Sequence, residues 1–120
     1  MLIDTSVWIN HFREPNADLE YLLDEGRVAT HPFVIGELAC GSLRRRGEVL
    51  RLIEALPFTP VATHDEVLSF IERQHLHGSG LGWTDMHLLA SARLGRQSLW
   101  SADRRLRQIA VRLGLTDLDQ

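Results

Sequence analysis

Four acidic residues are spaced along the chain in positions from which their carboxylates could meet. Asp4 follows three apolar residues at the start of the chain, and Glu37 is the lone acid within the apolar segment FVIGELAC. Asp85 comes after the glycine-rich segment GSGLG, and Asp103 comes after the segment QSLW. A shared acidic site is the first chemistry that these four residues suggest.

A cluster of four carboxylates is stable mainly around a metal ion, because like charges repel and raise one another's pKa. Carboxylate oxygens are ligands of hard cations such as Mg²⁺ and Mn²⁺. Such an ion activates water and neutralises charge on a phosphate group. An all-carboxylate site therefore favours hydrolysis of phosphodiester bonds over the zinc chemistry of peptidases.

Each acid also has a structural interpretation that the sequence leaves open. Asp85 and Asp103 stand at expected helix starts, where aspartate commonly caps the helix and contributes about 1 kcal/mol. Glu37 could lie on the solvent-facing side of its helix. If Glu37 instead faces the other acids, an unpaired carboxylate there would cost several kcal/mol, which a metal ion would offset.

Short apolar segments alternate with longer amphipathic ones along the chain, which predicts an α/β fold. We expect strands over residues 1–4, 27–30, 59–62 and 97–100, and an edge strand over 115–118. We expect helices over residues 5–12, 17–26, 47–56, 64–77, 84–94 and 103–113, and one that begins at residue 32. This alternation predicts a short, mostly parallel sheet covered by helices. Ligands bind at the carboxyl ends of such strands, where Asp4 stands.

Several helix starts carry residues that could serve as caps. We expect Thr5 or Ser6 to cap the first helix, and Thr84 to cap the helix that follows the glycine-rich segment. The helix over residues 64–77 is amphipathic, and its predicted inward side is formed by Val67, Leu68 and Ile71.

The composition is that of an ordinary globular protein and predicts a single domain over residues 1–120. Hydrophobic residues make up 44% of the chain, but no apolar run is long enough to span a membrane. The first residues lack the basic stretch of a signal peptide. The single cysteine, Cys40, cannot form an internal disulfide. We therefore expect a cytoplasmic protein without a membrane partner.

All 13 basic residues are arginines, and they are concentrated in two regions although the net charge is −3. One run occupies residues 44–46, and a second group fills the last third of the chain. A compositional bias of the source genome is the simpler explanation for the absence of lysine. Arginine also binds phosphate in a bidentate manner. The candidate contacts for a nucleic acid are therefore Arg104, Arg105 and Arg107, directly after Asp103.

Four segments resemble, in order and spacing, the four motifs of PIN-domain nucleases. They are LIDTSVWI at the N-terminus, FVIGELACG around Glu37, GLGWTDMHLLASA around Asp85 and LWSADRRL around Asp103. Each motif alone is weak, but all four in this order are fairly specific. The short length and the coverage of the whole chain resemble the VapC-type toxin of a toxin–antitoxin pair.

The resemblance implies a metal-dependent endoribonuclease that is inhibited by a small cognate antitoxin. It implies a single PIN-like domain with a short parallel sheet between two layers of helices, a three-layer α/β/α arrangement. The acids of the family carry over to the four positions named above, as catalytic residues and ligands of Mg²⁺ or Mn²⁺. Ser6 and Ser101 would be polar supports of the site. The chain would form a homodimer or a hetero-oligomer with its antitoxin.

Three departures from the family pattern leave the acids intact. Ser101 stands where threonine is usual and keeps the hydroxyl group. Leu106 replaces a commoner aromatic residue, which is a change in the core. Met86 and His87 follow Asp85 where small or aliphatic residues are usual, and this difference could alter substrate access.

Other interpretations stay open. A PIN-like domain could bind RNA or protein without cleaving, although a non-catalytic copy would be free to lose some of the acids. A histidine-based metal site is disfavoured, because His75 and His77, the one close pair, would diverge on a helix. The three tryptophans are most simply core or interface residues, yet Trp83 could stack on a base.

Overall fold

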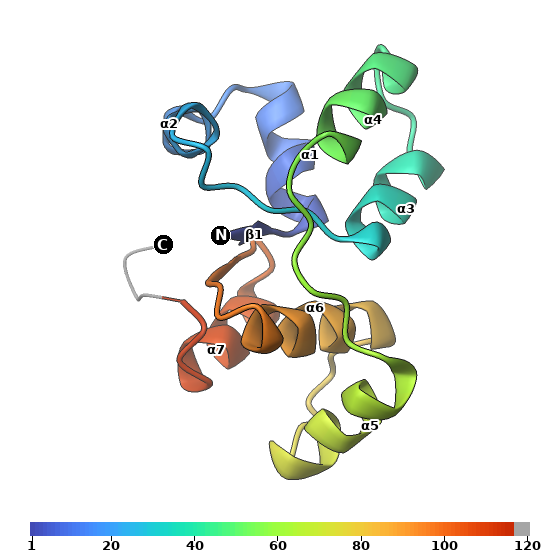
Figure 1. Cartoon of the computed structure of the whole chain (residues 1–120), viewed down its shortest axis with the longest axis vertical. Coiled ribbons are helices and arrows are strands. Elements are labelled where there is room, and N and C mark those ends of the chain that lie inside the picture. The colour runs from blue at the N-terminus through green and yellow to red at the C-terminus, as the bar shows by residue number, and fades with distance from the viewer. Residues whose placement is uncertain (117–120) are drawn as a thin grey trace.

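The computed structural model describes residues 1–116, within which it contains seven helices and two short strands (Figure 1). The strands are β1 (Leu2–Ile3) and β2 (Leu99–Trp100). The helices are α1 (Thr5–Arg13), α2 (Ala17–Asp24), α3 (Pro32–Cys40), α4 (Arg46–Glu54), α5 (His64–Arg73), α6 (Trp83–Leu94) and α7 (Arg104–Arg112). The chain is therefore an α/β protein, as the sequence predicted. No helix of this described part is long and apolar enough to cross a membrane.

The two strands form a small parallel sheet at the centre of the molecule. β1 pairs with β2 so that Leu2 lies opposite Leu99. Isolated parallel bridges extend the pairing on the other side of β1, first from Leu2 to Ala29 and then from Thr30 to Phe58. The predicted parallel arrangement is thus confirmed, but most of its strands are shorter than expected.

The prediction of continuous strands over residues 27–30 and 59–62 is wrong. The region 27–30 is reduced to the bridge residues 29 and 30, and the region 59–62 contains no strand residue. Pro57 and Pro60 flank the bridge at Phe58, and proline has no N–H for a strand ladder. The predicted edge strand over 115–118 falls partly outside residues 1–116. Within them, the carbonyl of Leu115 accepts a hydrogen bond from the amide of Leu99.

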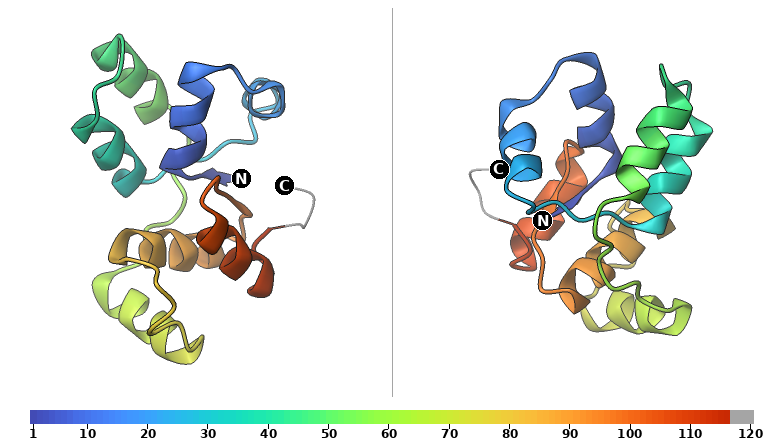
Figure 2. Two further views of the ribbon diagram at one scale, coloured as in Figure 1. Left: turned by 180° about the vertical axis from the view of Figure 1, so that it is seen from behind. Right: turned by 45° about the horizontal axis from the view of Figure 1, so that its top comes forward.

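β1 lies between two groups of helices, with α1 to α4 on one side and α5 to α7 on the other (Figures 1 and 2). Both strands and α6 contribute to the core, and Leu106 of α7 is fully buried there, as predicted. Because each strand has only two residues, the full three-layer arrangement stays a prediction. The carboxyl end of β1 leads directly into α1, and the carboxyl end of β2 leads toward α7.

The caps of two helices differ from the predicted ones. The N-cap of α1 is Asp4, and the hydroxyls of Thr5 and Ser6 are used in other contacts. The N-cap of α6 is Gly82, so the helix begins before Thr84. In both cases the helix begins earlier than expected. β1 ends before Asp4, and the glycine-rich loop ends at Gly82, so the expected capping residues already lie inside the helices.

α5 is shorter than predicted and packs on α6 (Figure 1). It begins after a reciprocal capping pair, in which Thr63 and Glu66 exchange side-chain and backbone hydrogen bonds. It ends at Arg73, and His75 then has a positive φ of 54° that no helix continues. Val67 is fully buried, but Leu68 is 45% exposed, so its predicted inward position is wrong.

Candidate active site

Asp4 ends β1 and is held by two serine hydroxyls. Its amide donates to the carbonyl of Trp100 at 2.9 Å, which places it beside the end of β2. The Oγ of Ser6 donates to Asp4 Oδ2 at 2.6 Å, and the Oγ of Ser101 donates to the same oxygen at 2.9 Å. Because both serines bind Oδ2, these two bonds fix the direction of the Asp4 carboxylate.

Both serine hydroxyls are themselves supported by the turn that follows β2. The amide of Ala102 donates to Ser6 Oγ at 2.9 Å, and the amide of Asp103 donates to Ser101 Oγ at 2.9 Å. Hydrogen bonds in series polarise one another, so each hydroxyl becomes a stronger donor to the carboxylate of Asp4. These bonds connect Asp4 with the start of α7, although the two lie far apart in the sequence.

Asp103 and Asp85 both form bonds at helix starts. Asp103 Oδ1 accepts from the amide of Leu106 at 2.9 Å, and Asp85 Oδ2 accepts from the amide of Gly82 at 3.3 Å. The capping interpretation is therefore correct for both residues. Each bond uses one carboxylate oxygen and fixes the direction of the other, so capping does not exclude a second role.

Glu37 lies on an exposed side of α3 and receives a hydrogen bond from α1. The Oγ1 of Thr5 donates to Glu37 Oε1 at 2.7 Å. This role of Thr5 was not predicted from the sequence, in which its hydroxyl was expected to cap the first helix. The sequence did hold a signal for this role: Asp4 directly precedes Thr5 and occupies the N-cap position, which leaves the Thr5 hydroxyl available for another contact.

The four site acids are Asp4, Glu37, Asp85 and Asp103, and an electrostatic effect of the other three is resolved at Asp85. The pKa of Asp85 is raised above its usual value, first by burial and then by the negative charges of Asp4, Asp103 and Glu37. The hydrogen bond from the amide of Gly82 opposes this shift. Three acids distant in sequence thus lie within electrostatic reach of Asp85.

The site acids approach one another without forming a complete ligand set. In the described residues, no three His, Cys, Asp or Glu side chains lie together in a group that could hold a metal ion. The donors fit a hard cation, because all of them are carboxylate or hydroxyl oxygens. The assignment of the four acids as ligands stays a prediction.

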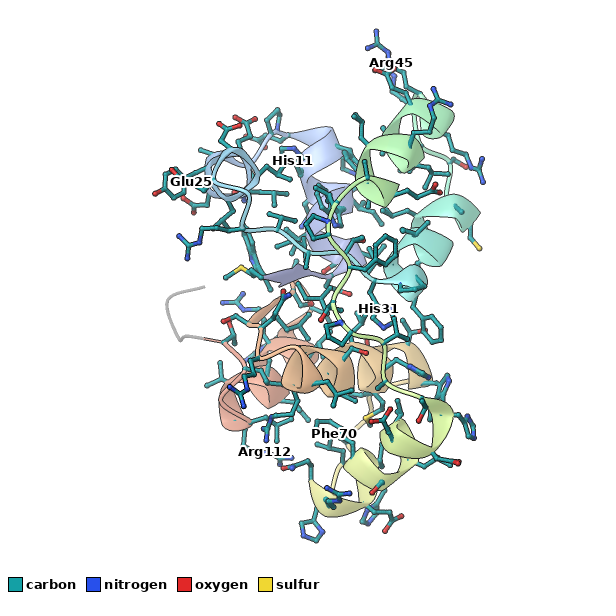
Figure 3. The ribbon with its side chains drawn as sticks, viewed as in Figure 1. His11, Glu25, His31, Arg45, Phe70 and Arg112 are labelled. Atoms are coloured by element: carbon teal, nitrogen blue, oxygen red, sulfur yellow. The ribbon has the colours of Figure 1, made fainter. Side chains whose placement is uncertain are left out.

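The predicted RNA-binding arginines, Arg104, Arg105 and Arg107, are exposed on α7, which begins directly after Asp103. The guanidinium of Arg105 lies against Gly80, where any side chain would collide with it. Arg105 therefore covers the segment that precedes Asp85. The other arginine run lies elsewhere, since Arg45 is at the tip of the molecule beyond α4 (Figure 3).

A buried histidine joins the two helices that carry Glu37 and Asp85. His31 is fully buried between α3 and α6 (Figure 3), and its Nδ1 accepts from the amide of Phe33 at 3.0 Å. Because Nδ1 accepts, Nε2 carries the proton and donates to the Oγ of Ser91, 3.1 Å away. Ser91 Oγ also accepts from the amide of Ala62 at 3.1 Å. The sequence analysis did not identify this network.

The charge state of His31 follows from its burial. Burial, and secondarily the charge of His87, lowers the pKa of His31 from 6.5 to about 4. The ring is therefore neutral at pH 7, which matches its role as acceptor on one nitrogen and donor on the other.

Known proteins are similar to this chain over nearly its whole length. The PIN domain family matches residues 1–112, a range that contains all four site acids. Ribonuclease VapC32 of Mycobacterium tuberculosis strain CDC 1551 / Oshkosh is 46% identical over 116 residues, which cover 96% of this chain and 94% of the relative. Ribonuclease VapC32 of strain ATCC 25618 / H37Rv has the same identity and coverage.

Proposed function

The chain belongs to the PIN-domain family, and from this premise we propose that it is a metal-dependent endoribonuclease and the toxin of a toxin–antitoxin pair. The relatives named Ribonuclease VapC32 support RNA as the substrate. The observation that carries the proposal is the chain of hydrogen bonds that joins Asp4, through Ser6 and Ser101, to the backbone of Asp103 at the carboxyl ends of the two strands. Hydrolysis of a phosphodiester bond is the chemistry that such a site favours.

The four site acids are the proposed ligands of Mg²⁺ or Mn²⁺, which would supply an activated water and neutralise charge on the phosphate. Ser6 and Ser101 fix the direction of the Asp4 carboxylate. Thr5 does the same for Glu37. Ligands that are oriented by outer hydrogen bonds bind a metal more tightly, because less order has to be created on binding.

Arg104, Arg105 and Arg107 are the proposed contacts for RNA phosphates. They follow Asp103 on α7, so their positive charges belong to the helix that this acid caps. Arginine binds phosphate oxygens in a bidentate manner. The negative net charge of the chain makes such a local contact more important than bulk attraction.

The proposed partners are a small antitoxin protein and a second copy of the chain. Ile9 and Phe12 of α1 are 36% and 38% exposed, and large apolar side chains on one helix face support contact with another chain. We also propose that residues 1–120 fold as one three-layer α/β/α domain. The alternative, a PIN-like domain that binds RNA or protein without cleaving it, predicts no hydrolysis under any metal condition.

Cleavage of RNA by the purified chain tests the proposed activity. We expect cleavage of total RNA with Mg²⁺ or Mn²⁺, little with Ca²⁺ and none with excess EDTA, because Mg²⁺ requires a tight octahedral geometry that Ca²⁺ does not reproduce. The variant Asp4→Asn, purified in parallel, should be inactive and so controls for contaminating nucleases. Undiminished cleavage in EDTA would remove the metal from the mechanism, and no cleavage in any metal would favour the binding-domain alternative.

A further inference from the structure

Four aromatic side chains meet where α3, α5 and α6 begin. We call this group the aromatic shelf; it consists of Phe33, His64, Trp83 and His87. The ring centroids of Trp83 and His87 are 4.7 Å apart, those of Phe33 and His87 are 4.3 Å apart, and those of His64 and Trp83 are 5.1 Å apart. Trp83 is nevertheless 39% exposed, whereas Trp8 is 3% exposed.

The shelf stands on the same two helices as two of the site acids. Phe33 precedes Glu37 by four residues on α3, so both lie on one face of that helix. Trp83 and Asp85 both belong to the first turn of α6, although residues two apart on a helix project in different directions. The starts of α3 and α6 face each other (Figure 1). A nucleotide bound at the acids would therefore have its neighbour close to the shelf.

Trp83 is partly exposed, and neither of its ring contacts is a parallel stack. The plane of His87 is turned by 85° from the indole, and that of His64 by 53°, so neither ring lies parallel to Trp83. Trp8 differs, because Phe12 stacks on it at an interplanar angle of 23°. Among the ring contacts of the described residues, Trp8 has a parallel partner and Trp83 has none.

His87 adds a polar feature to the shelf. The side chain is only 6% exposed, and its Nδ1 is buried without a hydrogen-bond partner within residues 1–116. Buried polar atoms are usually paired, so this nitrogen is a position for an ordered water inside the shelf. A nucleobase would meet the exposed aromatic face of Trp83.

From these contacts we propose that the aromatic shelf stacks an unpaired base of the RNA, next to the phosphodiester bond at the site acids. This inference rests on the proposed function for the identity of the substrate. It assigns Trp83 the stacking role. His64 and His87 hold the indole, and Phe33 packs against His87. The shelf selects single-stranded RNA, because a base in a duplex has no free face to offer.

Binding of a single-stranded RNA oligonucleotide in EDTA, where the metal-dependent reaction is stopped, tests the shelf. We expect Trp83→Ala to weaken binding by roughly 5- to 100-fold, the range for loss of one stacked base. Trp83→Phe should retain most of the affinity because it keeps an aromatic face. Tyr21→Ala is the matched control, since Tyr21 is 58% exposed on α2, away from the acids. It should bind as the parent does.

Oligonucleotides with one abasic position at a time locate the stacked base. In the parent, one abasic position should weaken binding strongly, and in Trp83→Ala the same position should have little further effect, as a coupled pair requires. Equal affinity of parent and Trp83→Ala, additive effects at every abasic position, or no RNA binding at all would overturn the shelf. Coupled binding without cleavage in any metal would uphold the shelf and remove the proposed activity.

Discussion

Two of the site acids, Glu37 and Asp85, lie on the two helices that the His31 network joins, yet the acids and the network are opposite kinds of polar cluster. Around His31, both ring nitrogens have partners and the group carries no charge at pH 7. Around Asp85, burial and then three like charges make ionisation less favourable. The first arrangement lowers the free energy of the folded chain, whereas the second raises it, a cost that the proposed cation would offset.

The difference shows how one scaffold can serve two purposes. His31 ties the start of α3 to Ser91 in the middle of α6, and Glu37 and Asp85 lie on those helices. The paired network thereby fixes the relative position of the two helices, and the unpaired charges use that position. If this division is correct, substitutions in the two regions must change different observables.

Asp103→Asn should have the largest effect of the substitutions, and the effect should be on catalysis. Asparagine caps a helix about as well as aspartate, so the bond to the amide of Leu106 survives while the charge is lost. We expect the cleavage rate to fall at least about a hundredfold, because a metal site contributes several kcal/mol to transition-state stabilisation. Stability without metal should be unchanged or higher, and stabilisation by added Mg²⁺ should shrink.

Asp103→Ala separates the charge from the cap. It should be as inactive as Asp103→Asn but less stable by about 1 kcal/mol, since it also loses the cap. Thermal unfolding with and without Mg²⁺, together with initial cleavage rates, measures both effects. An Asp103→Asn protein with parental activity would remove this residue from the site and leave it only the structural role.

His31 should affect stability and its dependence on pH. Its folded-state pKa of about 4 lies below the unfolded value of 6.5, so the unfolded chain binds more protons between these two values. The free energy of unfolding should therefore fall as the pH falls from 6.5 to about 4, by an amount on the order of 3 kcal/mol from this residue. The contribution is fully present above pH 6.5.

His31→Asn keeps a capping acceptor for the amide of Phe33 but has no imidazole to protonate. Denaturant unfolding at several pH values should find it less stable than the parent at pH 7, and the gap should narrow toward pH 4. Ring resonances of His31 in NMR spectra should stay those of a neutral imidazole down to nearly pH 4. A ring that titrates near pH 6.5, with a constant gap, would contradict the paired network.

The sequence was sufficient where a local pattern determines the structure. Asp4 at the end of an apolar segment and Asp103 at a helix start were predicted from neighbouring residues, and both positions are confirmed. Strand lengths were not predictable in this way, because short strands depend on pairing with distant segments. The region 59–62 has an apolar pattern but forms no strand beside Pro57 and Pro60.

The contacts that the sequence could not provide join residues far apart in the chain. Ser101 and Asp4 are separated by 97 positions, and His31 and Ser91 by 60. The hydroxyl of Thr5 had a plausible local use as a cap, and only the position of α3 reveals that it donates to Glu37. A single sequence gives residue types for such sites, but tertiary packing decides which hydroxyl meets which acid.

Asp85→Asn should give the smallest change in the free energy of unfolding. The effect of Asp85 on the pH dependence of stability has the opposite sign to that of His31. The raised pKa of Asp85 means that the folded chain disfavours the charged form, first through burial and then through the three other acids. The metal-free parent therefore loses stability as the pH rises and the Asp85 carboxyl ionises. The asparagine side chain of the variant does not ionise, so the variant does not lose stability in this way. Since Asn can still accept from the amide of Gly82, we expect the variant to be more stable at pH 7 by about 0.5–1 kcal/mol, the range for partly exposed charge interactions. The gain should vanish below the usual pKa of 3.8, where the carboxyl is neutral in both states.

Asp18→Asn on exposed α2 is the matched control and should lack this dependence on the site acids. Denaturant unfolding in EDTA at pH 7 and at pH 3.5 measures the effect. A variant that is less stable than the parent at pH 7 would mean that the Asp85 charge is compensated within the chain, and the contrast between the two regions would then be lost at its central residue.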